Sequence, residues 1–136
     1  MSDPTADAVP ELDAAALAEL DAFARKFDRE LAAGITALAL LAVLDADTPL
    51  YGYQIAKRLE RGDGSVLAGK QSALYPVLRG LDAAGLLSSE TQPSLSGPPR
   101  RYYRLTALGR AALQRCAARW RDTRRDLDAL LGDPYA

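Results

Sequence analysis

The sequence predicts a mostly α-helical fold with one small β-hairpin, arranged as a winged helix-turn-helix with additional N-terminal and C-terminal helices. Three observations support this fold class. A helical pattern containing Leu74-Tyr75-Pro76 ends at Gly85. Two strand-like segments follow it, joined by a tip of Ser, Pro and Gly residues, and a long helix then begins at Thr106. Such a unit places one helix in the DNA major groove and a basic hairpin against the phosphates.

The chain is expected to divide into five segments. Residues 1–10 should be a disordered tail, residues 11–31 an N-terminal extension helix, and residues 32–105 the winged helix. Residues 106–131 should form a C-terminal dimerisation helix, followed by a tail at residues 132–136.

The first two helical segments differ in how their apolar residues are distributed. Across residues 12–31 apolar side chains recur at steps of three and four, which indicates an amphipathic helix. Gly34 is expected to interrupt this helix. Residues 35–44 are apolar on nearly every side, as expected of a helix at the centre of a small domain. A turn is predicted at residues 45–49.

Two further helices complete the helix-turn-helix. One spans residues 52–61 and stops at Gly62-Asp63-Gly64. The other begins at residue 72 or 73 and runs to about residue 84. Pro76 is expected within the first turn or one residue past it, where a missing N–H costs little. The inward positions by spacing are Leu74, Leu78 and Leu81, and Gly85 is the C-terminal stop.

The hairpin and the last helix follow. Residues 86–92 and 100–105 are the predicted strands, and residues 93–99 form an exposed tip. Thr106 is a suitable N-cap for the last helix. That helix carries an apolar stripe longer than a small domain needs to cover its own core: Leu108, Ala112, Cys116, Trp120, Thr123, Leu127 and Leu130.

Composition limits the classes of function. The 136 residues are 49% hydrophobic, which predicts a packed fold. The chain has no His and one Cys, so a disulfide framework, a His-containing zinc site and Ser-His-Asp catalysis within it are excluded, and no cofactor is predicted. The longest apolar run is about half of the roughly 20 residues that cross a bilayer. The acidic start lacks the pattern of a signal peptide, and a cytoplasmic protein with no membrane contact is expected.

Charge is distributed unevenly along the chain. The formal net charge is −1, which alone argues against a nucleic-acid partner. Residues 1–30, however, hold eight acids and three bases, whereas residues 51–104 hold eight bases and four acids. The basic excess therefore lies in the predicted winged helix, and local charge matters more for DNA binding than the total.

The third helix carries candidate DNA contacts. A lysine at its start can reach phosphates, Gln and Arg side chains can bind base edges, and a tyrosine can stack on a sugar or donate to a phosphate. A solvated helix face is the alternative explanation. The candidates are Lys70, Gln71, Ser72, Tyr75 and Arg79.

The predicted wing is basic. Arg100, Arg101 and Arg104 lie close to a Gly-Pro-Pro tip. Alternation along a strand places Arg101 and Tyr103 on one face and the other two arginines on the opposite face. A charged edge strand that only resists aggregation is the alternative, but a basic wing after a candidate recognition helix favours double-stranded DNA as the partner.

The apolar stripe of the last helix requires a partner. Two copies exchanging their last helices would form a two-fold homodimer, with the two third helices about 34 Å apart to match a palindrome. The alternative is a monomer in which the first helix covers the last. Cys116, Trp120, Thr123 and Leu127 lie near the centre of this interface. Trp120 would be either a flat wall for a planar effector or ordinary interface core, and a buried, unreactive Cys116 is expected.

Parts of the sequence suggest two other functions. Residues 64–70 resemble a phosphate-binding loop, but Gln71 stands where the motif needs Ser or Thr, and a helix precedes it instead of a strand. An enzyme is therefore not expected. A winged helix used only for protein contacts would explain the acidic N-terminal segment, and nothing in the sequence separates that role from charge screening or from packing at a dimer interface.

A series of motifs across residues 32–130 resembles the PadR family of transcriptional regulators. The resemblance implies a homodimeric repressor of a near-palindromic operator, released in many cases by an aromatic or drug-like small molecule. Spacing and the resemblance together place Tyr53 and the wing arginines Arg100 and Arg101 among the DNA contacts, and Tyr103 on the wing is a further candidate. The acidic residues 1–30 depart from the family pattern. The matching residues are Tyr51-Gly52-Tyr53-Gln54-Ile55, Leu74-Tyr75-Pro76-Val77-Leu78-Arg79, Leu81 with Gly85-Leu86, Gly97-Pro98-Pro99-Arg100-Arg101-Tyr102-Tyr103 and Leu105-Thr106-Ala107-Leu108-Gly109.

Overall fold

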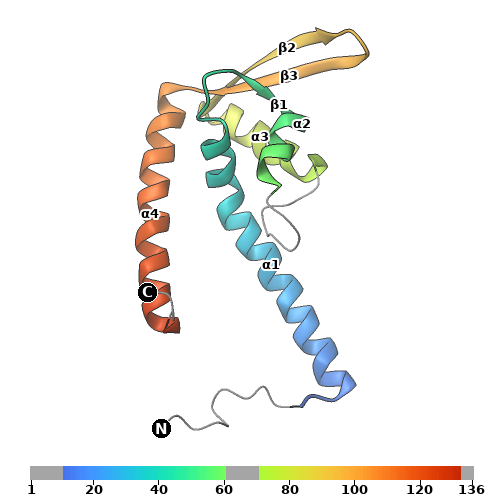
Figure 1. Cartoon of the computed structure of the whole chain (residues 1–136), viewed down its shortest axis with the longest axis vertical. Helices are drawn as coiled ribbons and strands as arrows, with labels where there is room; N and C mark the ends of the chain where they lie inside the picture. Colours follow the sequence, from blue (N-terminus) through green and yellow to red (C-terminus); the bar gives the residue numbers. More distant parts are fainter. Residues whose placement is uncertain (1–10, 61–70, 133–136) are drawn as a thin grey trace.

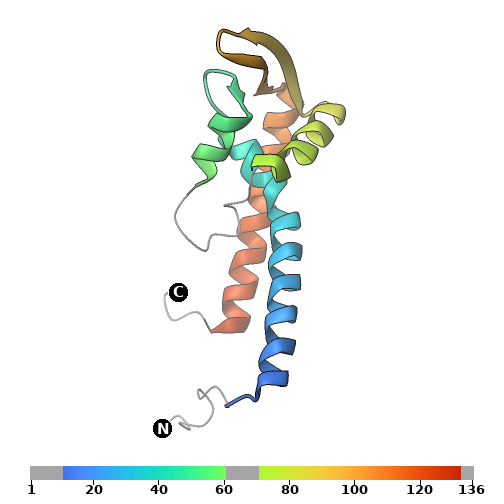
Figure 2. The ribbon, with the colours of Figure 1, turned by 90° about the vertical axis from the view of Figure 1, so that its right-hand side faces the viewer.

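The computed structural model describes residues 11–60 and 71–132. Helices α2 and α3 and a small sheet form a head, from which α1 and α4 extend on the same side as two diverging arms (Figures 1 and 2). The predicted fold class, a mostly α-helical winged helix with an extra helix at each end, is confirmed. The elements are α1 (Ala14–Val43), β1 (Leu50–Tyr51), α2 (Gly52–Leu59), α3 (Gln71–Ala83), β2 (Leu87–Ser94), β3 (Gly97–Leu105) and α4 (Ala107–Leu131).

The core lies where the C-terminal end of α1 meets α2, α3 and the sheet. Leu40, Ile55 and Leu78 are completely buried there, each from a different helix. The remaining buried side chains come from the same elements and from the strands, and they are almost all leucines: Leu41, Leu44, Leu50, Leu59, Leu74, Leu81, Leu87, Tyr103 and Leu105. The head is therefore built around one apolar cluster that fixes α3 against the sheet.

Helix α1 is one continuous helix of 30 residues. Its start is capped by Asp13, whose side chain accepts a hydrogen bond from the amide of Ala16 at 2.8 Å. The expected interruption at Gly34 is wrong. A single glycine costs only about 1 kcal/mol relative to alanine, and the alanine- and leucine-rich sequence around it favours a helix. The extension and the central apolar segment therefore form a single rod.

Helix α3 differs from expectation at its start and agrees at its end. It begins at Gln71, so Pro76 lies two residues beyond the first turn, and the hydrogen bond to the carbonyl four residues earlier is lost. At the other end Gly85 has a φ of +80°. Its amide donates to the Asp82 carbonyl at 2.9 Å, and the Leu86 amide donates to the Leu81 carbonyl at 3.0 Å. This pair of bonds is a Schellman C-cap, which confirms the predicted stop.

The sheet has three antiparallel strands in the order β1-β3-β2. The hairpin is longer than expected, because β2 reaches Ser94 and β3 starts at Gly97. Pro93 lies on an edge strand where the register shifts between Gln92 and Ser94, a place where a missing N–H is tolerated. Strand β1 was not predicted, because two residues are too few to show an alternating pattern.

Thr106 joins the two ends of the hairpin. Its side chain accepts from the Gly109 amide at 3.0 Å and donates to the Gly85 carbonyl at 2.7 Å, and its own amide donates to the Leu86 carbonyl at 3.1 Å. The predicted N-cap is therefore confirmed. The same side chain ties the start of α4 to the end of α3.

Candidate nucleic-acid interface

The exposed surface of α3 lies opposite the leucines that it buries. Arg79 and Gly80 are exposed on this surface, while Leu74 and Leu78 point into the core. Gln71 and Ser72 occupy the first turn of α3. Lys70, the remaining candidate from this region, lies outside the described residues. The geometry thus leaves one side of α3 accessible to a partner.

Tyr75 connects α3 to the start of α2. A Cβ atom built on Gly52 would lie 2.7 Å from the Tyr75 hydroxyl oxygen and 2.8 Å from its Cε1. Only glycine fits at position 52 without moving the ring. Tyr75 is half-buried by this contact, so it holds the two helices of the helix-turn-helix together as well as facing the wing.

A cleft of about 430 Å³ opens between this tyrosine and the wing. The side chains that line it combine aromatic, hydroxyl and cationic groups, which suits contact with a sugar-phosphate backbone. Its lining residues are Tyr51, Gly52, Tyr75, Ser94, Ser96, Gly97, Pro98, Pro99, Arg100 and Arg101.

Arg100 is held by aromatic side chains. Its guanidinium carbon lies 4.5 Å from the centre of the Tyr51 ring, which is a cation–π distance. Tyr102 contacts the same ring edge-on at 5.3 Å, and Tyr53, which is 52% exposed, stacks on it at 6.4 Å. Sequence reasoning missed Tyr51 and Tyr102, which become neighbours only when β1 pairs with β3. The Arg100 side chain itself remains exposed.

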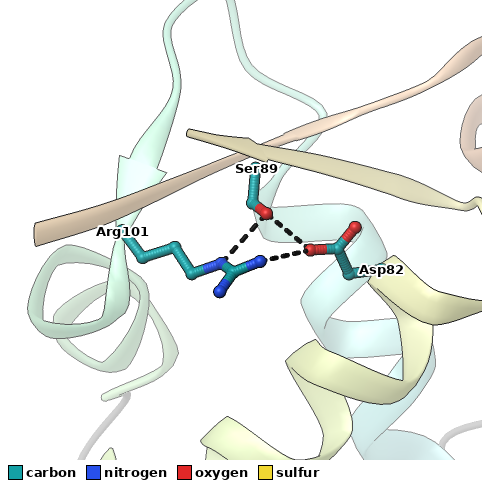
Figure 3. Close-up of polar contacts among 3 residues, drawn as sticks. All are labelled: Asp82, Ser89 and Arg101. Atoms are coloured by element: carbon teal, nitrogen blue, oxygen red, sulfur yellow. Dashed lines mark hydrogen bonds and ion pairs between the residues drawn. The ribbon is translucent and has the colours of Figure 1, made fainter. Parts of the chain in front are cut away.

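Arg101 points to the opposite face of β3, toward α3 (Figure 3). One terminal nitrogen lies 3.3 Å from Asp82 Oδ2, and Nε donates to Ser89 Oγ at 3.0 Å. Neither Asp82 nor Ser89 was predicted as part of the site. Strand alternation gave the side on which Arg101 lies, but the acid that it meets is 19 residues away in the sequence.

Tyr103 belongs to the core and not to the surface. Its side chain is 2% exposed and packs within the apolar cluster. Burial raises the pKa of its hydroxyl above the ordinary value of 10.0; nearby Arg101 opposes this shift and Asp82 adds to it. A side chain this buried cannot reach a phosphate, so the expectation that Tyr103 contacts DNA is wrong.

A second surface feature lies between the arms. A groove of about 360 Å³ is lined by residues of α1 and α4, including Ile35, Cys116, Trp120 and Thr123. Leu127 lies farther along α4 and is 51% exposed. The Cys116 thiol was expected to be buried, but it is exposed in the single chain.

Within residues 11–60 and 71–132 no group of three or more His, Cys, Asp or Glu side chains is placed to hold a metal ion. No helix in this part of the chain combines the length and the apolar character needed to span a membrane.

An exposed α3, a basic hairpin wing and two long helices, α1 before and α4 after them in the sequence, define the class of winged-helix transcription regulators. The family model described as the PadR-like family of transcriptional regulators matches residues 40–115. That span is more than half of the chain, and the chain belongs to this family.

Individual relatives agree with this assignment. The structure of a PadR family transcriptional regulator from Eggerthella lenta superposes with a TM-score of 0.69 at 30% identity, covering 85% of this chain and 97% of that one. A transcriptional regulator of Mycobacterium tuberculosis is 44% identical over 68 residues, which is 50% of this chain and 60% of the relative. Bacillus subtilis PadR, solved in complex with operator DNA, has a TM-score of 0.54 at 25% identity and covers 61% of this chain and 46% of its own.

Proposed function

We propose that this regulator is a repressor that binds a near-palindromic operator as a homodimer. The observation that carries the proposal is the cleft between the start of α2, α3 and the wing, with the exposed guanidinium of Arg100 at its edge. The Bacillus subtilis relative was solved with operator DNA bound. A protein that occupies an operator excludes other proteins from the same DNA, and repression is the simplest consequence.

One set of residues contacts the bases of the DNA, and a second set contacts its phosphates. The start of α3, with Gln71 and Ser72, and the exposed Arg79 approach the base edges of the major groove. Arg100 on the wing and Tyr53 on α2 approach the phosphates, which position the protein without distinguishing sequence. Lys70 precedes α3 and is assigned to the phosphates as well.

The exposed apolar side chains of the two arms support a homodimer. Phe23 and Phe27 on α1 are 66% and 53% exposed, and Trp120 on α4 is 42% exposed. Large apolar side chains in a row are unfavourable in water and are typical of an interface. A two-fold arrangement of the arms would place two copies of α3 about one DNA turn apart.

The groove between the arms is the proposed site for a planar, apolar effector that releases DNA. Trp120 lines it, and this is the single Trp of the chain. Its fluorescence therefore reports on the surroundings of this one side chain in the groove. Titration with an anilinonaphthalene dye should quench Trp120 and weaken DNA binding together, whereas quenching without any change in DNA affinity would argue against release by an effector.

The decisive experiment is capture of genomic fragments by the purified protein, followed by sequencing. The control is the Arg100→Ala/Arg101→Ala double variant, which removes two cations of the wing. One enriched near-palindrome that is absent with the control supports the proposed function. Equal recovery by both proteins would contradict it and would favour a winged helix that contacts only other proteins.

A further inference from the structure

Three side chains from three different elements meet beside the base of the wing. Asp82 lies in the last turn of α3, Ser89 lies on β2 and Arg101 lies on β3 (Figure 3). In the hairpin Ser89 pairs with Tyr103 and Thr91 pairs with Arg101, so Ser89 and Arg101 are diagonal neighbours on one face. We call these three residues the wing latch.

The latch fixes the direction of the guanidinium. The Ser89 hydroxyl donates to Asp82 Oδ2 at 2.5 Å and accepts from Arg101 Nε at 3.0 Å. A terminal nitrogen of Arg101 lies 3.3 Å from the same carboxylate oxygen. Two separate N–H groups of one guanidinium are therefore engaged, one by each partner, and a rigid planar group held in this way cannot rotate freely.

The placement of Asp82 is unfavourable unless Arg101 is present. A carboxylate in the last turn of a helix is repelled by the negative end of the helix dipole. The only cation that forms an ion pair with it among the described residues is Arg101, and Asp82 is the more buried partner, with 24% of its side chain exposed against 55% for Arg101. The pair thus compensates a charge that would otherwise disfavour both the helix end and a nearby phosphate.

We propose that Arg101 is a positioning residue that sets the angle of the wing relative to α3, and that Arg100 makes the phosphate contact. This inference rests on the proposed function. Because Asp82 already neutralises Arg101, the guanidinium releases little further counterion when DNA binds. Arg100 emerges on the opposite face of β3, and the Tyr51 ring that it lies over carries no charge to compensate it.

The test compares three single variants by the salt dependence of their affinity for a duplex carrying the captured operator sequence. Ser89→Ala breaks the latch without changing any charge, and Arg101→Ala breaks it from the other side. Arg100→Ala, one residue away on the same strand, is the matched control. For each variant the affinity and the slope of log K against log salt are measured.

The positioning role predicts that Ser89→Ala and Arg101→Ala both lower affinity by roughly two- to tenfold, with effects that do not add in the double variant. Their salt slopes should stay at the wild-type value. Arg100→Ala should reduce the magnitude of the slope by about 0.9, the amount lost with one phosphate contact.

Three results would overturn the inference. If Arg101→Ala reduces the slope as Arg100→Ala does while Ser89→Ala binds normally, Arg101 is itself a phosphate contact. If the wild type binds the duplex no better than Arg100→Ala does, the proposed function fails and the positioning role fails with it. If the wild type binds the duplex and Ser89→Ala binds it with the same affinity, only the positioning role fails and the proposed function stands.

Discussion

At the scale of single residues, close approach of the backbone dictates glycine at one position in the first turn of α4. A Cβ atom on Gly109 would lie 2.0 Å from the carbonyl oxygen of Leu86, inside any tolerable contact. Gly80, on the exposed side of α3, has nothing within 4 Å of the same built atom. Identical substitutions at the two positions should therefore have opposite effects.

Gly109→Ala should destabilise the fold by about 1–3 kcal/mol, because the start of α4 must move away from the end of α3. Gly80→Ala should stabilise it by about 0.5–1 kcal/mol, because alanine loses less backbone entropy in a helix. Urea unfolding followed by circular dichroism measures both. Similar midpoints for the two variants would contradict the close contact at Gly109.

The buried Tyr103 gives stability a dependence on pH. Because burial raises its folded-state pKa above 10.0, the unfolded chain releases the phenolic proton first as the pH rises. The folded state then holds more protons than the unfolded state, so this contribution to stability is complete below pH 10 and declines above it. Tyr103→Phe lacks this titration.

Between about pH 8 and about pH 11 the unfolding free energy of the wild type should therefore fall relative to that of Tyr103→Phe. Urea titrations at the two pH values measure it, and the other tyrosines cancel in the comparison. A difference that stays constant across this range would contradict a raised pKa at Tyr103.

The sequence predicted the faces of the wing better than the partners of its residues. Alternation correctly separated Arg100 from Arg101, because strand geometry alone decides it. It could not show that Tyr103 is buried, because one of its buried neighbours, Leu50, lies on β1. A strand of two residues is too short to be recognised from an alternating pattern in the sequence. The pairing of Arg101 with Asp82 depends on the angle between a helix and a hairpin, which no local pattern encodes.

At the scale of elements, α1 is the main departure from expectation. Gly34 indicated a break, but the helix passes through it because local preference for a break is weaker than the combined preference of its neighbours. By contrast, the ends of α3 and α4 were predictable. Gly85 and Thr106 are residue types with specific capping geometry, and both cap where expected.

The continuity of α1 can be tested at Gly34 itself. Gly34→Pro should break the rod at a cost of about 3 kcal/mol, because proline removes a hydrogen bond and clashes with the preceding turn. Gly34→Ala, the matched control, should keep or increase helix content. Far-UV circular dichroism and the thermal midpoint report the outcome, and unchanged helicity in the proline variant would mean that the two halves already behave as separate helices.

At the scale of the whole molecule, a compact head carries two arms (Figure 1). Apolar side chains on both arms are open to solvent. The sequence indicated an unpartnered stripe on the last helix, and the same exposure is present on α1. Leu17, Leu20, Phe23 and Phe27 are each about half exposed or more. The acidic extension therefore has an apolar face available for packing, which favours a role in assembly.

Phe23→Glu/Phe27→Glu should convert a homodimer into a monomer and lower affinity for a palindrome, because two charges would replace apolar area in the proposed interface. Light scattering at micromolar concentration measures the mass. Arg25→Glu/Arg29→Glu, with the same spacing on the same helix, is the control and should leave the mass unchanged. A wild-type protein with a monomeric mass would refute the proposed assembly.

The hydrogen bonds that Thr106 makes to the end of α3 have a consequence for how such a regulator can diversify. The chain enters the β2-β3 hairpin after Gly85 and Leu86, and at Thr106, where the hairpin ends, it bonds with the carbonyls of those same two residues. The hairpin between Leu86 and Thr106 therefore begins and ends at the same point of the structure. Residues can be gained or lost at Leu95 and Ser96 without altering the spacing between α3 and α4. The reach of the wing along a duplex and the alignment of the two arms can therefore evolve, or be engineered, independently of each other.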